Sequence, residues 1–162
     1  MIKFIVGIAI VIFCSCCGYK LAGKYRRKKE FYRQLSTFNE RFLDELSYHR
    51  RPIIEFINAH SYKGEFQVLI YTFLDYLMDK EKEAFLTDGQ YPFLKAEEKG
   101  EIKEYFLMLG RGSVDTQKNY FSSAKTRLEN MRTEAENTCN RYVDLYVKIG
   151  FLCGLFILIL II

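Results

Sequence analysis

The sequence predicts an all-α protein, in which an antiparallel helical bundle in the cytoplasm lies between an N-terminal and a C-terminal transmembrane helix. The chain has 162 residues, with 24 Lys and Arg and 20 Asp and Glu, yet residues 4–19 and 149–162 carry no charged side chain. Between these ends, apolar residues recur with the helical period, and no segment keeps the two-residue alternation of a strand. The predicted segments are a transmembrane helix over residues 1–23, a cytoplasmic helical domain over 24–144 and a transmembrane helix over 145–162.

The first element is predicted to be a spanning helix over residues 2–23. A bilayer core about 30 Å thick needs about 20 helical residues. Only Lys3 and Lys20 interrupt this stretch, each near an interface that its ammonium group can reach. The main alternative is a cleaved signal peptide, because Lys3 followed by an apolar stretch fits that pattern too. The lack of a small-x-small cleavage site, and helix-compatible sequence continuing into residues 24–29, favour a retained anchor.

A basic cluster after this span predicts the orientation of the chain. Residues 20–33 hold seven basic side chains and one acidic side chain, Glu30, whereas the outer end has only Lys3 and the amino terminus. An excess of Lys and Arg beside a span marks the cytoplasmic side, so the central region is predicted to be cytoplasmic. The cluster also suits anionic lipid head groups. Its core is Lys24, Arg26, Arg27, Lys28 and Lys29.

The anchor helix is expected to continue into the cytoplasm with one apolar face. It is predicted to end at Arg51, because the residue before a proline disfavours helix, and Pro52 can then begin a short helix carrying residues 53–57. The apolar face comprises Phe31, Leu35, Phe38, Phe42 and Leu46.

Two further helices are predicted in the middle of the chain. Residues 66–77 are apolar nearly all round, which is typical of a central buried helix. The dipeptides Asp88-Gly89 and Tyr91-Pro92 mark a loop, and residues 97–109 are expected to form the next helix.

The last helix is predicted to carry a heptad seam that leads directly into the second span. Apolar and small residues recur there in alternating steps of three and four. The expected partner of the seam is the apolar face over residues 31–46, antiparallel in the same chain, and self-association along the seam is the alternative. Seam positions include Phe121, Leu128, Met131, Ala135 and Tyr142.

The residues give no catalytic, metal-binding or cofactor-binding signal. His49 and His60 have no companion ligand at helical spacing, and the five cysteines form neither a disulfide framework nor a metal motif. Most cysteines lie in the proposed spans, where acylation of Cys16 or Cys17 stays open. Residues 34–148 hold 16 basic and 19 acidic side chains, so nucleic-acid binding is not expected.

A polar turn at residues 110–117 resembles a phosphate-binding loop only faintly, because no Lys-Ser/Thr pair ends it. Gly110 is expected to close one helix and Gly112 or Ser113 to cap the next, with Asp115 in its first turn.

Three stretches of the chain carry short motifs in a fixed order, which are Glu45-Leu46-Ser47-Tyr48 with Pro52-Ile53, then Leu109-Gly110 with Gln117 and Phe121, and last Tyr146–Leu152 with Gly154-Leu155. Together these stretches resemble the stage III sporulation protein AB family. Where the family usually has Ser-Asp, this chain has Gly112-Ser113, with Asp115 two residues later, so a role for that acidic side chain is in doubt.

The resemblance implies a fold similar to the cytoplasmic domain of type II secretion platform proteins. It implies a non-enzymatic platform in the mother-cell membrane, within the channel that joins mother cell and forespore. The implied partners are a cytoplasmic secretion-type ATPase encoded nearby and other membrane subunits. A general helical tether that binds lipid and itself is the alternative. The candidate partner site is the turn with Gly110, Arg111, Gly112, Ser113, Asp115 and Gln117, which is otherwise only a capping turn.

Overall fold

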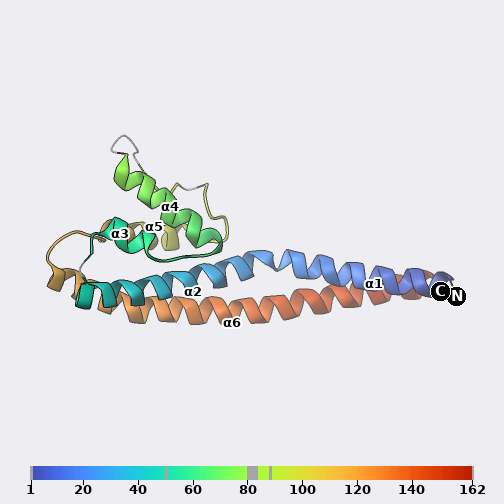
Figure 1. The fold of residues 1–162 in the computed structure, drawn as a ribbon. Coiled ribbons are helices and arrows are strands. Elements are labelled where there is room, and N and C mark those ends of the chain that lie inside the picture. Colours follow the sequence, from blue (N-terminus) through green and yellow to red (C-terminus); the bar gives the residue numbers. More distant parts are fainter. Residues whose placement is uncertain (1, 50, 80–83, 88, 162) are drawn as a thin grey trace. The chain divides into compact units, whose positions relative to one another are not determined.

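A computed structural model describes residues 2–49, 51–79, 84–87 and 89–161, and this part of the chain contains helices and no strand, so the all-α prediction is confirmed (Figure 1). Its compact units are residues 1–29 with 134–162, called unit 1, and residues 30–133, called unit 2. The elements are α1 (Ile2–Leu21), α2 (Gly23–Asp44), a π-helical turn (Glu45–His49), α3 (Ile53–Asn58), α4 (Gly64–Met78), α5 (Ala96–Leu107) and α6 (Val114–Ile161).

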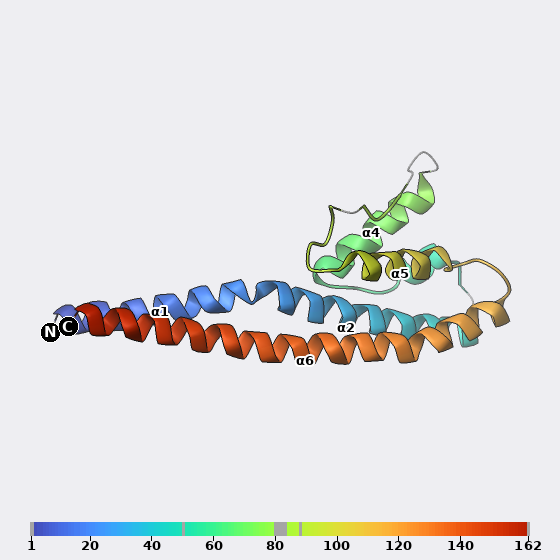
Figure 2. The ribbon, with the colours of Figure 1, turned by 180° about the vertical axis from the view of Figure 1, so that it is seen from behind.

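In unit 1, α1 and the end of α6 run antiparallel and in close contact (Figures 1 and 2). A Cβ atom added at Gly150 would lie 2.5 Å from the carbonyl oxygen of Cys14, and one at Gly154 would lie 2.7 Å from the Cα of Val11. Small residues at such positions let helix backbones approach closely, which is a common packing mode in membranes.

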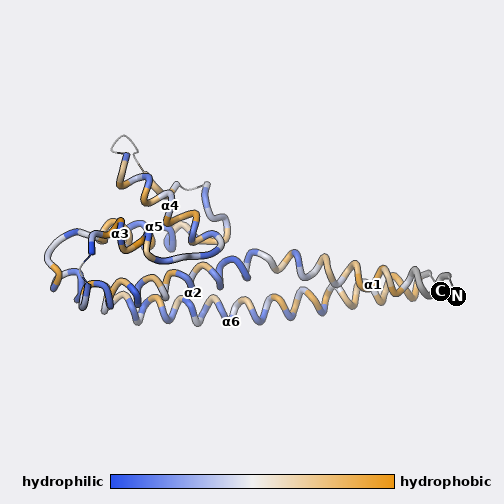
Figure 3. The backbone as a smooth tube through the Cα atoms, in the orientation of Figure 1, coloured by the Kyte–Doolittle hydropathy of each residue, from blue (hydrophilic) through white to orange (hydrophobic). Residues whose placement is uncertain are grey.

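Many large apolar side chains of this helix pair are exposed, and Figure 3 shows that both helices are hydrophobic along this stretch. Among the described residues, α6 is long and apolar enough to cross a membrane, and most of its apolar stretch is not buried by protein. The described part of α1 meets the same criterion only together with α2. Exposed side chains include Ile12, Phe13, Leu21, Phe151, Leu152, Phe156, Ile159 and Leu160.

The predicted uninterrupted helix from the anchor to Arg51 is wrong at two points. The helix breaks at Ala22, which separates α1 from α2, and α2 ends at Asp44, where the π-helical turn begins. Proline explains only the stop near Arg51, whereas these two changes depend on packing: Ala22 is fully buried in unit 1, and Glu45 is fully buried in unit 2.

The core of unit 2 is built around Phe38 on α2, which is fully buried. Its ring centroid lies 5.5 Å from that of Phe56 on α3, 5.8 Å from that of Phe66 on α4 and 5.7 Å from that of Phe106 on α5. Offset and edge-on ring pairs at these distances add to the free energy of burial. One side chain of α2 therefore holds three other helices.

A buried amide beside Phe38 links α2 to two more elements. Asn39 is 0% exposed. Its Nδ2 donates a hydrogen bond to the carbonyl oxygen of Phe121 on α6 at 3.2 Å, and its Oδ1 accepts one from the hydroxyl of Tyr105 on α5 at 3.0 Å. A buried polar group costs stability unless it is hydrogen-bonded, so this arrangement favours one register of the three helices.

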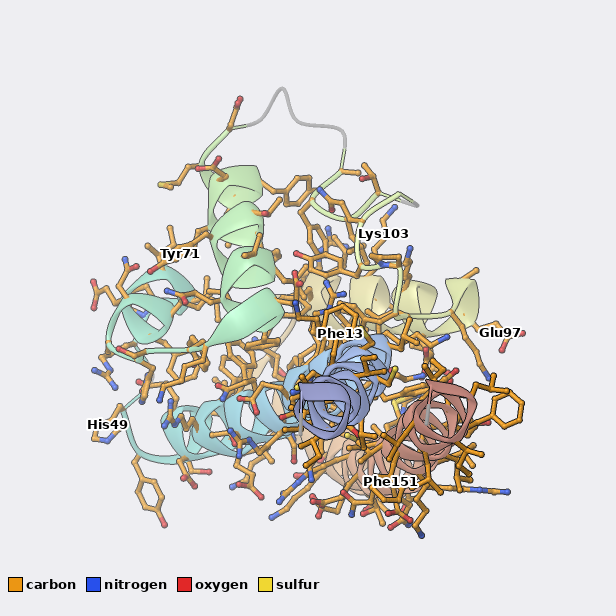
Figure 4. All side chains as sticks on the ribbon, turned by 90° about the vertical axis from the view of Figure 1, so that its right-hand side faces the viewer. Phe13, His49, Tyr71, Glu97, Lys103 and Phe151 are labelled. Carbon is orange, nitrogen blue, oxygen red and sulfur yellow. The ribbon has the colours of Figure 1, made fainter. Side chains whose placement is uncertain are left out.

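The expectation that residues 66–77 are buried on all sides is wrong. In α4, Phe66, Leu69, Ile70 and Phe73 point into the core, but Val68 is 54% exposed and Tyr71 59% exposed. Figure 4 shows Tyr71 on the outer side of α4. The other helices of unit 2 cover only one face of α4. The apolar residues on its other face are therefore exposed, although the sequence of the helix is apolar on every side.

Replacing Asn39 with Ala should destabilise unit 2 by about 1–3 kcal/mol, because Tyr105 loses its buried hydrogen-bond partner. Chemical denaturation of the full chain in detergent micelles measures this difference. Asn130→Ala, on the exposed face of α6, is the matched control and should change stability little. Equal effects of the two substitutions would contradict a structural role for the amide.

Replacing Gly150 with Ala should loosen the α1–α6 pair and lower thermal stability by about 1–3 kcal/mol, because the new methyl group collides with the α1 backbone. Gly100→Ala in α5 is the control. No atom lies within 4 Å of its added Cβ, and alanine favours helix over glycine by about 0.5–1 kcal/mol. Opposite signs of the two changes are expected, and stabilisation by both would argue against the close approach.

Candidate functional site

The turn between α5 and α6 has a backbone that requires glycine at two positions. Gly110 has φ +74° and Gly112 has φ +81°, both in the left-handed region. Ser113 then caps α6, because its Oγ accepts a hydrogen bond from the backbone N–H of Thr116 at 3.2 Å. Asp115 lies in the first turn of α6. The capping predicted from the sequence therefore matches the observed geometry.

Gln117 differs from its predicted neighbours in the turn, because it belongs to the interior. It is only 7% exposed, whereas Arg111 and Asp115 are exposed. Its Oε1 accepts a hydrogen bond from the backbone N–H of Gly110 at 3.2 Å. Gln117, which the sequence placed in the candidate partner site, therefore also shapes the turn, because its amide links the residues after α5 to the start of α6.

An ion pair between the buried Glu45 and the partly exposed Arg51 closes the π-helical turn at the end of α2. Glu45 is 3% exposed, and its carboxylate accepts hydrogen bonds from the backbone N–H of Arg51 at 2.9 Å, from Nε at 3.0 Å and from Nη2 at 2.6 Å. The hydrogen bonds from Arg51 outweigh desolvation and lower the pKa of Glu45 to about 2. A buried carboxylate is tolerated when it is paired and hydrogen-bonded in this way.

The Glu45–Arg51 ion pair and the Gln117–Gly110 hydrogen bond both lie in the wall of one cavity in unit 2, which has a volume of about 340 Å³. One wall comes from the end of α2 and the start of α3, and the other comes from the α5–α6 turn. Two of the three stretches singled out in the sequence, which are separated by more than fifty residues, therefore meet here. The lining residues are Phe42, Glu45, Leu46, Arg51, Pro52, Ile53, Gly110, Val114 and Gln117.

The basic cluster lies in unit 1 among tyrosines. The guanidinium of Arg26 lies 3.6 Å from the ring centroid of Tyr19, and its Nη2 donates to the Tyr19 carbonyl oxygen at 3.0 Å. Lys24 lies over the ring of Tyr25, and Lys29 forms an ion pair with Glu136 at 2.6 Å. Arg27 is exposed and Lys28 is half-buried.

Tyrosines from α2 and α6 meet beside this cluster. The rings of Tyr25 and Tyr142 stack with centroids 4.4 Å apart, and Tyr146 lies next to both. Tyrosine and basic side chains together are typical of the boundary between membrane and water.

The predicted seam residues lie on the covered side of α6. Phe121, Leu128 and Ala135 are buried within a single chain, and Met131 and Tyr142 are half-buried. In unit 2 the ring of Phe121 lies 4.8 Å from that of Phe42, and Leu128 and Met131 line a small void with Leu35. These contacts favour packing within the chain over an exposed seam.

The described residues contain no group of three or more His, Cys, Asp and Glu side chains that could hold a metal ion. His49 is exposed at the end of the π-helical turn (Figure 4), and Nδ1 of His60 lies 2.9 Å from the Phe56 carbonyl oxygen. Cys14, Cys16, Cys17, Cys139 and Cys153 form no disulfide, and Cys16 and Cys17 are exposed.

Sequence reasoning missed the pairing of Glu45 with Arg51 and the buried amides of Asn39 and Gln117. A signal existed for Asn39, because it is a polar residue beside the apolar face of α2. The Glu45 motif also contained a signal, since an arginine six positions after an acidic residue, just before a proline that ends the helix, can fold back to pair with it.

A family model described as stage III sporulation protein AB matches residues 3–162. No curated protein and no solved structure matches the chain.

Replacing Glu45 with Gln should remove a pH-dependent part of the stability of unit 2. The pKa of Glu45 is lowered from 4.5 to about 2, so its ionised form stabilises the fold above pH 4.5, and this contribution is lost as the pH falls towards about 2. Denaturation midpoints over this pH range should fall more steeply for the wild type than for Glu45→Gln. Glu40→Gln, at an exposed site, should behave as the wild type; identical pH profiles for all three chains would contradict the assignment.

Proposed function

The chain belongs to the stage III sporulation protein AB family, and from this premise we propose that it is a non-enzymatic membrane platform of the channel complex between mother cell and forespore. Membership gives the chain a role in sporulation. The proposed partners are the cytoplasmic secretion-type ATPase encoded nearby and other membrane subunits of the channel.

Unit 1 supports the membrane part of this proposal. The exposed apolar faces of α1 and α6 form a paired surface that water would solvate poorly, and lipid would cover it. The Lys24–Lys29 cluster and its tyrosines then lie at one boundary of the bilayer, where basic side chains favour the cytoplasmic side and anionic lipid. This reasoning supports a cytoplasmic location for unit 2.

The cavity in unit 2 is the observation that carries the platform proposal. Its walls combine apolar side chains with polar groups that are already paired, Glu45 with Arg51 and Gln117 with Gly110. A carboxylate with a pKa of about 2 stays ionised near neutral pH, so Glu45 is a poor general acid or base. A preformed, mostly apolar cavity with fixed polar groups suits the binding of a partner segment.

The platform proposal is tested by affinity capture from sporulating cells. The full-length chain should co-purify with the ATPase encoded beside it and should restore spore formation to a strain that lacks its gene. Arg111→Ala, an exposed change beside the cavity, should reduce capture about tenfold, as expected for a contacting arginine. Restored spore formation without any capture of the ATPase by the wild type would favour the general tether instead.

The orientation is tested at the α5–α6 turn. Ser113→Cys, in a chain whose five native cysteines have been replaced, should react with a membrane-impermeant maleimide only after protoplasts are opened. The exposure of Ser113 makes it reachable once the reagent enters. Labelling in intact protoplasts would reverse the orientation and exclude a cytoplasmic partner at this turn.

A further inference from the structure

The side-chain polar groups of the 340 Å³ cavity that are not yet hydrogen-bonded are donors. The Gly110 N–H occupies Oε1 of Gln117, which leaves the amide nitrogen Nε2 without a partner among the described residues. Gln117 is only 7% exposed, but its unpaired Nε2 is not among the fully buried side-chain atoms, so this nitrogen can be reached from solvent.

Arg51 contributes the second unused donor group. Its backbone N–H, Nε and Nη2 bind Glu45, whereas Nη1 has no partner among the described residues. The side chain is 39% exposed at the cavity wall. Both oxygens of Glu45 are hydrogen-bonded to Arg51, so its negative charge is balanced within the wall.

The rest of the cavity wall is apolar, and the cavity is large. Phe42, Leu46, Pro52, Ile53 and Val114 supply it. A cavity of roughly 150 Å³ holds a benzene molecule, so this one has space for a large apolar side chain and a neighbouring polar group. An inorganic anion would leave these walls without an apolar partner.

We propose that this cavity binds a segment of the protein partner in which a carboxylate lies next to a large apolar side chain. The carboxylate accepts hydrogen bonds from Nε2 of Gln117 and Nη1 of Arg51, and the apolar side chain packs against Ile53 and Val114. Arg111 is exposed and follows Gly110 in the chain, so it adds positive charge to the same turn. This inference rests on the proposed function, because it names the chemistry by which the platform recognises its ATPase.

Two variants separate the roles of charge and space. Gln117→Glu keeps an oxygen to accept the Gly110 N–H but removes the free donor and adds a negative charge, so it should repel a carboxylate while preserving the turn. Val114→Trp should fill the cavity. Val68→Trp, at an exposed position on α4, is the matched control and should behave as the wild type.

A small probe tests the cavity without any ATPase. Hydrocinnamate joins a phenyl ring to a carboxylate, and hydrocinnamide is its neutral match. Titration into the full chain in detergent micelles should shift the methyl NMR signals of Ile53 and Val114 saturably, with the acid binding about tenfold or more tightly than the amide. Equal affinities, no saturable shift, or unchanged binding of the acid to Gln117→Glu would overturn the assignment.

Capture of the ATPase then tests whether the ATPase supplies the carboxylate-bearing segment that binds in the cavity. Gln117→Glu and Val114→Trp should each lose most of the captured ATPase, and Val68→Trp should retain it. Retained capture by Gln117→Glu would overturn the cavity as the ATPase site while leaving the platform proposal intact. Absence of capture by the wild type would reject the platform proposal, and the probe titration would still decide the chemistry of the cavity.

Discussion

The structure of unit 2 depends on the pair of neighbouring α2 residues, Phe38 and Asn39. Phe38 gathers the rings of α3, α4 and α5, and Asn39 hydrogen-bonds to α5 and α6. Burial of aromatic rings contributes strongly to stability, but it lets neighbouring helices shift along one another. A buried amide favours only those helix positions in which its donor and acceptor atoms are hydrogen-bonded. Together the two residues supply both cohesion and register.

The cavity follows from that register. One turn after Phe38, Phe42 packs against Phe121 and also lines the cavity. The hydrogen bond from Asn39 to the Phe121 carbonyl oxygen fixes the same level of α6, one turn after Gln117. The end of α2 and the start of α6 are thereby held with a space between them, which Glu45 and Arg51 border from one side and Gln117 from the other.

Local patterns predicted the helices of this chain well, because periodicity, proline and glycine act within a few residues. The seam of α6, the glycines at 110 and 112 and the cap at Ser113 are such cases. The break at Ala22, the exposed face of α4, the buried Gln117 and the Glu45–Arg51 pair depend on which residues meet in the folded chain. A motif indicated that residues 45–53 and 109–117 matter, but only the fold shows that they share a cavity.

Site-specific photo-crosslinking in sporulating cells tests the central claim, that this cavity is where the platform meets its cytoplasmic partner. A photoreactive phenylalanine analogue at Ile53, in the cavity wall, is compared with the same analogue at Val68 on the exposed face of α4. The account predicts a crosslink to the secretion-type ATPase from position 53 and none from position 68. A crosslink from position 68 alone, or from neither position in cells that form spores, would contradict it.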